Sequence, residues 1–243
     1  MTQTMAKPLS SPKSSRSIDR KENMVDEIYD RVYVAVLEHR LQPGTKLGED
    51  RMAAIFGVSR SRMREVFSRL AHEGVVELYP QRGAFVAKPT PEQACNVFEM
   101  RRLIEPGIVQ RVIATLTPEK LARLQEHHAR ELDARARNDK RAIIRLSGEF
   151  HTLLAMLSGN FAMEKCMREL STLTCLIIAL YDAPTADTCR ADEHGAIIEA
   201  IEKGEQARTQ KLMLQHLNHI ESGLDLSLQG ENTDLEAIFG PAR

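Results

Sequence analysis

Residues 57–74 read GVSRSRMREVFSRLAHEG, and this stretch decides the fold of the 243-residue chain. Its apolar residues recur at steps of three and four, which predicts one amphipathic helix with a single buried stripe. The stripe comprises Val58, Met63, Val66, Phe67 and Leu70. Ser59 stands at the expected N-cap, where its hydroxyl can accept a hydrogen bond from a free backbone N–H of the first turn.

Basic side chains crowd the start of this helix. Arg60, Arg62 and Arg64 lie in or next to its first turn, and Arg69 follows on the outer side. Cations at a helix N-terminus oppose the helix dipole, so an ordinary surface helix does not favour this arrangement. A helix that enters a DNA major groove does favour it, because the duplex offers phosphates and guanine acceptors. Three arginines alone leave a solvated basic face open as the alternative.

The flanking sequence predicts a winged helix-turn-helix domain over residues 21–88. Helices are expected at 24–40 and 49–56, with Pro43-Gly44 as a turn and Gly57 ending the second helix. Strands at 75–78 and 84–87 flank a turn at 80–83. Gln81, Arg82 and Gly83 form the tip of this hairpin, from which they could reach a phosphate or the minor groove.

After a linker at 89–91, the pattern changes to long helices without strand signals, which predicts an all-helical domain over residues 92–228. The expected helices are 91–115, 117–137, 139–157, 161–181, 190–202 and 205–226, with a loop at 182–188. Pro106 should kink or break the first of them. The predicted fold is therefore mainly α, a winged helix-turn-helix followed by an antiparallel bundle of six or seven helices. Residues 1–20 are expected to be a disordered arm, and 229–243 a tail.

Charge is distributed unevenly along the chain. Residues 1–90 carry 15 Lys and Arg against 11 Asp and Glu, a net of +4, and the remainder carries 18 against 23, a net of −5. A basic front half and an acidic rear half fit a nucleic-acid-binding module joined to a different domain. The four cysteines show no metal-binding spacing and indicate reduced thiols. With no membrane span or signal peptide in evidence, we expect a cytoplasmic protein without membrane contact.

Residues 41–87, LQPGTKLGEDRMAAIFGVSRSRMREVFSRLAHEGVVELYPQRGAFVA, resemble the DNA-binding domain of GntR-family bacterial transcription regulators. The rear half resembles the all-helical ligand-binding (FCD) domain of the FadR subfamily. The positions that carry this second resemblance are Arg101, Glu105, Phe150-His151, Gly159-Asn160, Glu193-His194 and His216-Leu217.

The resemblance implies a homodimer that binds a double-stranded DNA operator containing an inverted repeat. By matching positions, Ser59, Arg60, Ser61 and Arg64 would lie at the DNA, with the wing around Gly83. The sequence departs from the family at Asp50, where some members carry an arginine that contacts DNA; Arg51 is the candidate substitute. The predicted DNA-binding residues are Arg51, Ser59, Arg60, Ser61, Arg62, Arg64, Gln81, Arg82 and Gly83.

The family's effector pocket often holds a metal bound by one Asp and three His, the Asp four residues before the first His. Here His151, His194 and His216 match the histidines, but Ser147 stands in the Asp position. Three neutral imidazoles suit a divalent transition metal such as Zn²⁺ or Ni²⁺. Loss of the anionic ligand should weaken binding. Glu149 is a poor replacement because it lies on a different helix face from His151. No organic cofactor is expected.

Arg101 matches a family arginine that faces the pocket, where it could clamp a carboxylate; an ion pair with Glu105 is the alternative. The predicted effector-binding residues are Arg101, Ser147, His151, His194 and His216. The expected function is a transcription regulator, most simply a repressor, controlled by a small metabolite rather than an enzyme. Two alternatives stay open: a metal-dependent hydrolase in the helical domain, and a helical interaction module with a vestigial DNA-binding domain.

Overall fold

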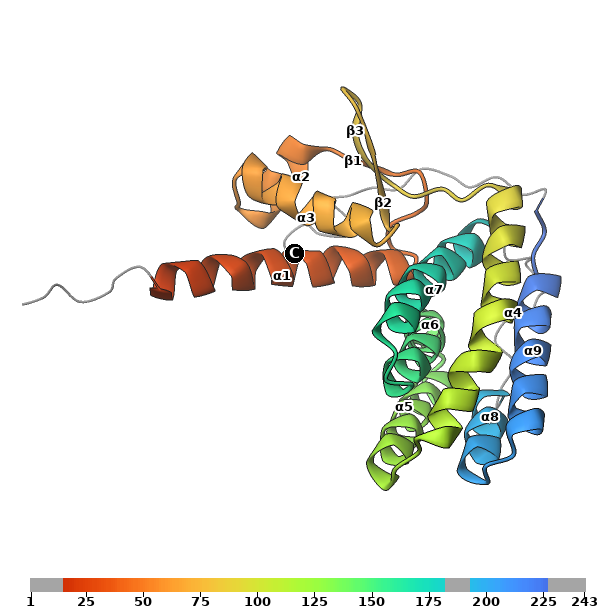
Figure 1. Ribbon diagram of the computed structural model, residues 1–243. Helices are drawn as coiled ribbons and strands as arrows, with labels where there is room; N and C mark the ends of the chain where they lie inside the picture. The colour runs from red at the N-terminus through yellow and green to blue at the C-terminus, as the bar shows by residue number, and fades with distance from the viewer. Residues whose placement is uncertain (1–14, 182–192, 227–243) are drawn as a thin grey trace, which may run out of the picture.

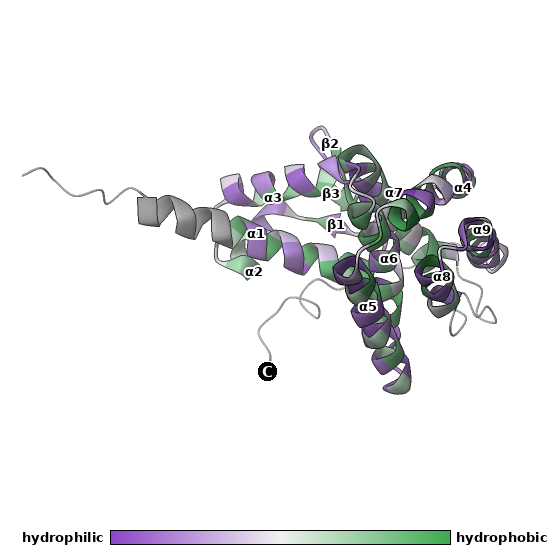
Figure 2. Cartoon of the chain, turned by 60° about the horizontal axis from the view of Figure 1, so that its bottom comes forward, coloured by the Kyte–Doolittle hydropathy of each residue, from purple (hydrophilic) through white to green (hydrophobic). Residues whose placement is uncertain are grey.

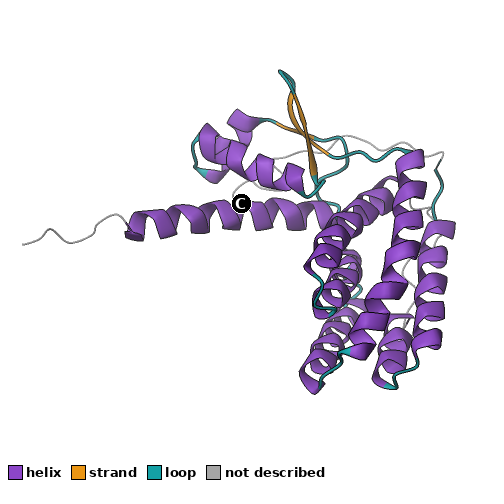
Figure 3. Cartoon of the chain, viewed as in Figure 1, coloured by secondary structure: helices purple, strands orange, loops and turns teal. Residues whose placement is uncertain are grey.

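A computed structural model describes residues 15–181 and 193–226 (Figure 1). The N-terminal module contains, in order, α1 (Ser15–Leu37), β1 (Lys46–Leu47), α2 (Glu49–Phe56), α3 (Arg60–His72), β2 (Val76–Tyr79) and β3 (Gly83–Val86). The C-terminal bundle contains α4 (Pro91–Ala114), α5 (Pro118–Ala136), α6 (Lys140–Leu157), α7 (Phe161–Tyr181), α8 (Glu193–Glu202) and α9 (Gln206–Ser222). Among the described residues, strands occur only in the N-terminal module (Figure 3).

The N-terminal module is a winged helix-turn-helix. Its three helices share a core that includes Val32 of α1, Met52 of α2 and Met63 of α3, each fully buried. Gly57 ends α2 at a φ of 65°, a left-handed conformation that glycine adopts without steric cost. Ser59 caps α3 as expected, since its side chain accepts from the backbone N–H of Arg62. The sheet is antiparallel with the order β1-β3-β2.

Two features of this module differ from the sequence prediction. α1 begins at Ser15 instead of residue 24, so part of the expected disordered arm is helical; residues 1–14 lie outside the described ranges. The stretch 15–24 contains no Gly or Pro, so nothing in it interrupts a helix that is stabilised further along. The short strand β1 was not predicted. Two residues are too few to display a period-two pattern.

The bundle forms from amphipathic helices that pack their apolar stripes together (Figure 2). The described residues contain the six helices expected, and α4 runs alongside α9 (Figure 1). The sequence predicted a kink or a break at Pro106; the break is wrong, because α4 continues through this residue as one helix, and the kink stays a prediction. The carbonyl of Pro106 accepts a hydrogen bond from Gln210 of α9. The predicted loop at 182–188 and the tail at 229–243 lie outside the described residues.

The N-terminal module contacts the bundle chiefly through α1 and the segment that follows it. Tyr33 Oη and Thr172 Oγ1 are 3.1 Å apart, and Nε2 of His39 lies 2.8 Å from the carbonyl oxygen of Cys175. Both bundle residues belong to α7. On α6, Arg145 Nε donates to Glu38 at 3.2 Å. Within the described ranges, no helix has the length and hydropathy required to cross a membrane.

Candidate functional site

Two predicted DNA-binding arginines share one face of α3. Arg60 and Arg64 are four residues apart, and about two thirds of each side chain is exposed. Each pairs with an acid at the start of α2: Arg60 with Asp50, and Arg64 with Glu49 at 2.8 Å. An exposed pair of this kind contributes little stability, so a phosphate can displace the acid at low cost.

The other predicted DNA-binding residues of α2 and α3 differ in how exposed they are. Ser59, Ser61 and Arg51 are exposed. Arg62 is half-buried and its guanidinium lies 3.7 Å from Met24 Sδ of α1, which turns it away from the face of Arg60. Arg62 thus lies on a different side of α3 from Arg60 and Arg64, and its predicted contact with DNA stays a prediction. The spacing explains this result, since positions two apart on a helix face different directions.

The wing tip is exposed and shaped by unusual backbone angles. Gln81 has a φ of 63° and Gly83 a φ of 95°, so two left-handed residues close the turn. The guanidinium of Arg82 lies 5.3 Å from the ring centroid of Tyr79 and 5.7 Å from that of Phe85. This stacking holds a cation at the end of the hairpin, where it is available to a phosphate.

The three predicted metal-binding histidines come together in the bundle core. His151 on α6, His194 on α8 and His216 on α9 are each at most 4% exposed. Nε2 of His216 lies 3.2 Å from Nε2 of His151 and 3.2 Å from Nε2 of His194. Tetrahedral Zn²⁺ ligation with Zn–N bonds of about 2.0–2.1 Å places two nitrogens about 3.3 Å apart. The convergence of these atoms therefore suits a bound metal.

Each histidine contacts a carboxylate through its other ring nitrogen. Nδ1 lies 2.6 Å from Glu105 in His151, 2.9 Å from Glu131 in His194 and 2.7 Å from Glu193 in His216. Burial raises the pKa of Glu105, but Arg101 and His151 outweigh it and lower that pKa to about 2. Glu131 and Glu193 also have lowered pKa values, because hydrogen bonds from histidines outweigh burial.

These contacts fix the chemistry of the converging nitrogens. An ionised carboxylate can only accept, so each Nδ1 must donate and each Nε2 carries a lone pair when the ring is neutral. Burial lowers the pKa of His151 to about 3 and that of His216 to about 4, which favours the neutral rings. Lone pairs 3.2 Å apart repel unless a cation lies between them. The donor set thus fits a divalent transition metal, with the glutamates orienting the rings.

Ser147 and Arg101 lie beside this histidine site, around a cavity of about 40 Å³ that both residues line together with His151. Arg101 is 1% exposed; its Nε pairs with Glu105 at 2.6 Å and its Nη1 donates to Thr174 at 3.1 Å. The ion pair considered from the sequence therefore exists. Its Nη2 is buried without a hydrogen-bond partner among the described residues, which leaves one donor available to a ligand.

Other acidic and histidine residues lie apart from the converging nitrogens. His127 Nε2 lies 2.9 Å from the carbonyl of Leu146, and His219 pairs with Glu193. Glu149 pairs with Arg145, as expected for a residue outside the site. Sequence reasoning missed that Glu131 would contact His194. No spacing signals it, because the two residues belong to helices distant in the chain.

Comparison with known families gives two matches that cover most of the chain. The family described as "Bacterial regulatory proteins, gntR family" matches residues 24–86, and the FCD domain matches residues 96–219. The boundary between the two matches falls between β3 and the first turns of α4.

Similar proteins are transcription regulators. The chain is 26% identical over 195 residues to the HTH-type transcriptional repressor RspR of Escherichia coli (strain K12), covering 80% of this chain and 85% of that protein. Two solved structures share the fold. E. coli McbR/YncC has a TM-score of 0.72 at 18% identity, over 82% of this chain and 95% of that one. A GntR regulator from Rhodococcus sp. RHA1 has a TM-score of 0.70 at 23% identity, over 93% of this chain and 100% of that one.

These relatives are regulators and not enzymes, so they lend no support to the alternative of a metal-dependent hydrolase. The winged helix-turn-helix, the all-helical bundle and both family matches agree. The chain belongs to the GntR family of bacterial regulatory proteins, in the branch that carries an FCD domain, and is a DNA-binding transcription regulator.

Proposed function

We propose that the protein is a homodimeric repressor that binds an inverted-repeat operator through α3 and the wing. Binding of a small carboxylate in the bundle would raise or lower the affinity of the protein for this operator. The exposed pair of Arg60 and Arg64 carries this proposal, because both side chains are about two thirds exposed and each pairs with an acid at the start of α2. A repressor acts on chromosomal DNA, which places it in the cytoplasm.

The proposed DNA contacts divide into two kinds. Arg60 and Arg64 would read base edges in the major groove, since both leave the first turns of α3 in one direction. Ser59, Ser61, Gln81, Arg82 and Gly83 would contact phosphates or the minor groove and set the orientation of the module. Arg51 would add a phosphate contact from α2.

The proposed effector site combines the histidines with Arg101. A divalent metal, Zn²⁺ or Ni²⁺ by its imidazole donors, would be held by His151, His194 and His216. When bound, the metal supplies a positive charge and an open coordination position for a ligand oxygen. A carboxylate would also accept from Nη2 of Arg101, which has no partner among the described residues.

Binding of such a ligand requires the bundle to rearrange. The cavity beside Arg101 has a volume of about 40 Å³, which is room for one or two water molecules but not for a metabolite. A ligand must therefore displace lining side chains, most of which belong to α6 and α7, the two helices that also contact the N-terminal module. Control of DNA binding follows if the ligand prefers one arrangement of these helices.

Operator binding tests the DNA-binding half of the proposal. An operator is first selected from random duplexes with the full-length protein, and its affinity is then measured at several salt concentrations. Arg60→Ala and Arg64→Ala should each weaken binding by about 1–3 kcal/mol, as expected for loss of a base contact. Arg137→Ala, at the residue that follows the C-terminus of α5 and pairs with Asp133, removes an exposed arginine as the matched control. Unchanged affinity in both α3 variants contradicts the proposed contacts.

The salt dependence separates this proposal from the vestigial-domain alternative. A protein that neutralises phosphates loses affinity steeply as salt rises, because bound counterions are released. Absence of any salt-dependent DNA binding favours the alternative.

Native mass spectrometry with elemental analysis tests the rest of the proposal. We expect two chains and one metal per chain. The metal should be lost in His194→Ala and kept in His219→Ala, which removes an exposed histidine of α9. A monomer would contradict the proposed homodimer, and an equal metal content in the two variants would contradict the proposed metal site.

A further inference from the structure

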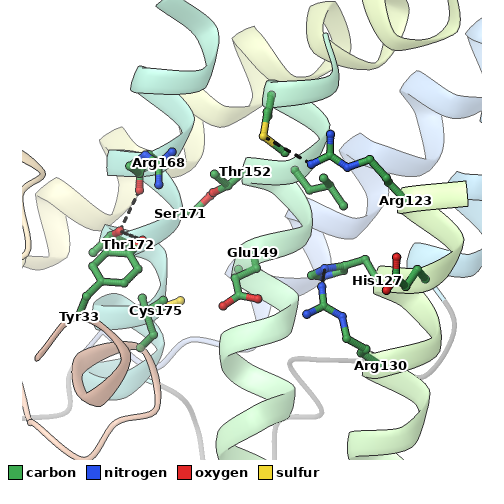
Figure 4. A pocket seen from close by; sticks show the side chains of 15 residues that line it. Tyr33, Arg123, His127, Arg130, Glu149, Thr152, Arg168, Ser171, Thr172 and Cys175 are labelled. Carbon is green, nitrogen blue, oxygen red and sulfur yellow. Dashed lines mark hydrogen bonds between the residues drawn. The ribbon is translucent and has the colours of Figure 1, made fainter. Parts of the chain in front are cut away.

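A second and much larger cavity lies where the N-terminal module meets the bundle. Its volume is about 490 Å³, within the range of small-molecule sites and far above the 40 Å³ beside Arg101. Tyr33 and Leu37 of α1 contribute to its lining, and all its other lining residues come from α5, α6 and α7 (Figure 4). We refer to it as the junction cavity.

The junction cavity is separated from the cavity beside Arg101 by a thin wall. Gly148, Ser171 and Cys175 line both cavities. A Cβ atom at Gly148 would lie 2.9 Å from Cys175 Sγ, so α6 and α7 touch closely here only because residue 148 has no side chain. A ligand in the junction cavity is therefore distinct from one that reaches the histidines.

Two arginines on one face of α5 border the junction cavity without an acidic partner. Arg123 Nη2 lies 3.7 Å from Met156 Sδ, and Arg130 Nη2 lies 3.0 Å from His127 Nδ1. Neither guanidinium has a carboxylate within 4.0 Å among the described residues. Seven residues apart, they lie on the same side of the helix, and Figure 4 shows both opposite Tyr33.

The other charges of the junction cavity largely cancel. Arg168 pairs with Glu164 at 3.2 Å, and Glu149 with Arg145 at 2.9 Å. Glu126 is the remaining lining acid, and Arg123 and Arg130 are the remaining lining cations, so a positive excess of one charge is left. An anionic group can therefore be held at the α5 side without competition from a strong internal pair.

The rest of the lining suits a compact organic molecule. Leu37, Leu153 and Met156 supply apolar surface, and the Tyr33 ring lies across the cavity from α5. Ser171 is 4% exposed, and its hydroxyl is buried without a hydrogen-bond partner in the described structure. Buried hydroxyls are normally paired, so this group offers a polar contact to a ligand.

We propose that the junction cavity is a second ligand site, which binds a small aromatic or aliphatic anion, a carboxylate or a phosphate ester, through Arg123 and Arg130. It goes beyond the effector proposed for the histidine site, because it uses different residues and requires no metal. A ligand here contacts α1 and the bundle together. It therefore stabilises the docked position of the DNA-binding module.

Calorimetric titration of the full-length protein tests this proposal, with benzoate and phenyl phosphate as probes at constant ionic strength. The probes share a ring and differ in the anion, so their relative affinity identifies the preferred group. We expect at least one to bind with one site per chain. In Arg123→Gln/Arg130→Gln its Kd should rise by about tenfold or more, and in Arg137→Gln it should stay within about twofold.

Variants of the histidine site distinguish this proposal from the proposed effector site. Arg101→Gln and His194→Ala should leave the Kd of the probe unchanged. Three results would overturn the proposal: a loss of probe affinity in these two variants, an unchanged Kd in the double arginine variant, or no saturation by either probe up to about 10 mM.

Methionine methyl resonances give an independent location for the probe. Met156 lines the junction cavity, and Met213 is fully buried in the bundle on α9. In protein labelled at methionine methyl groups, the probe should shift the Met156 signal, assigned with Met156→Leu, and leave the Met213 signal in place. The opposite pattern overturns the location.

Discussion

Three buried or partly buried glutamates from three different helices hold the histidines of the candidate metal site. Glu105 belongs to α4, Glu131 to α5 and Glu193 to α8. In the related proteins an aspartate would supply negative charge directly to a metal. Here the three glutamates would supply it through the imidazole rings. Ionised acids at Nδ1 raise the electron density at Nε2, which partly offsets the absence of a carboxylate ligand at position 147.

Replacement of Ser147 by Asp should strengthen metal binding. The side chain at 147 lies one helical turn before His151 and lines the same small cavity, so a carboxylate there can become a fourth ligand. We expect metal affinity, measured by competition with a coloured chelator, to rise about tenfold or more. Ser147→Asn, which has the same shape without the charge, should show no such gain. Equal affinities in the two variants would show that the position does not reach the metal.

Replacement of Glu131 by Gln should weaken metal binding while keeping all three histidines. Nδ1 of His194 then loses its ionised partner, and loss of such a contact typically costs about 10–100-fold in metal affinity. Glu126→Gln, on the same helix and outside the histidine site, provides the control. The same competition assay measures both. A Glu131→Gln protein with wild-type affinity would mean that the glutamate serves packing alone.

At the scale of single elements, helix caps determine where the two modules begin and end. Thr90 caps α4 immediately after the linker: its hydroxyl accepts from Gln93 N at 3.2 Å, and its own N–H donates to the Gln93 side chain at 2.8 Å. This capping box satisfies two backbone N–H groups, those of Thr90 and Gln93, at the start of α4.

Loss of this cap should destabilise the bundle. Thr90→Ala removes the hydroxyl acceptor and is expected to lower the free energy of unfolding by about 0.5–2 kcal/mol. Chemical denaturation of the full chain measures the change. Ser68→Ala, at an exposed interior position of α3, should change stability by no more than about 0.5 kcal/mol. A Thr90→Ala protein as stable as that control would contradict the role of the cap.

Elements with a cap and a long apolar pattern could be predicted from sequence, and shorter or contact-dependent features could not. α7 was predicted with its observed bounds, because Gly159-Asn160 marks its start and Asn160 caps it. β1 carries no pattern of its own and forms only by pairing with β3. Convergence of the histidines followed from the family resemblance. The pairing of Glu131 with His194 required the tertiary packing of α5 against α8.

At the scale of the whole molecule, α1 couples the DNA-binding module to the bundle through two adjacent helices. His39 is part of this junction, and its Nε2 donates to Cys175 O when the ring is neutral. Burial lowers the pKa of His39, and the hydrogen bond to Cys175 opposes this shift only in part. The folded protein therefore keeps a neutral ring at a pH where the unfolded chain takes up a proton.

The contribution of His39 to stability should therefore decrease as the pH is lowered. Because the folded pKa lies below the unfolded value of about 6.5, the contribution of His39 is complete above that pH and is lost as pH falls toward the folded pKa. Unfolding free energies at about pH 8 and about pH 5.5 should differ less in His39→Asn than in the wild type. Asparagine tolerates the φ of 55° at this position. Equal pH dependence in the two proteins would exclude His39 as a contributor.

One four-residue segment of α7 serves both ends of the molecule. Thr172 and Cys175 contact Tyr33 and His39, and between them Thr174 accepts from Arg101. If a compound bound in the bundle changes the affinity of the protein for its operator by some factor, the operator must change the affinity for the compound by the same factor. Protein held on immobilised operator duplex should therefore bind the proposed compound more tightly or more weakly than free protein by that same factor, so the protein–DNA complex can serve as a reagent to capture the compound from cell extract or to exclude it.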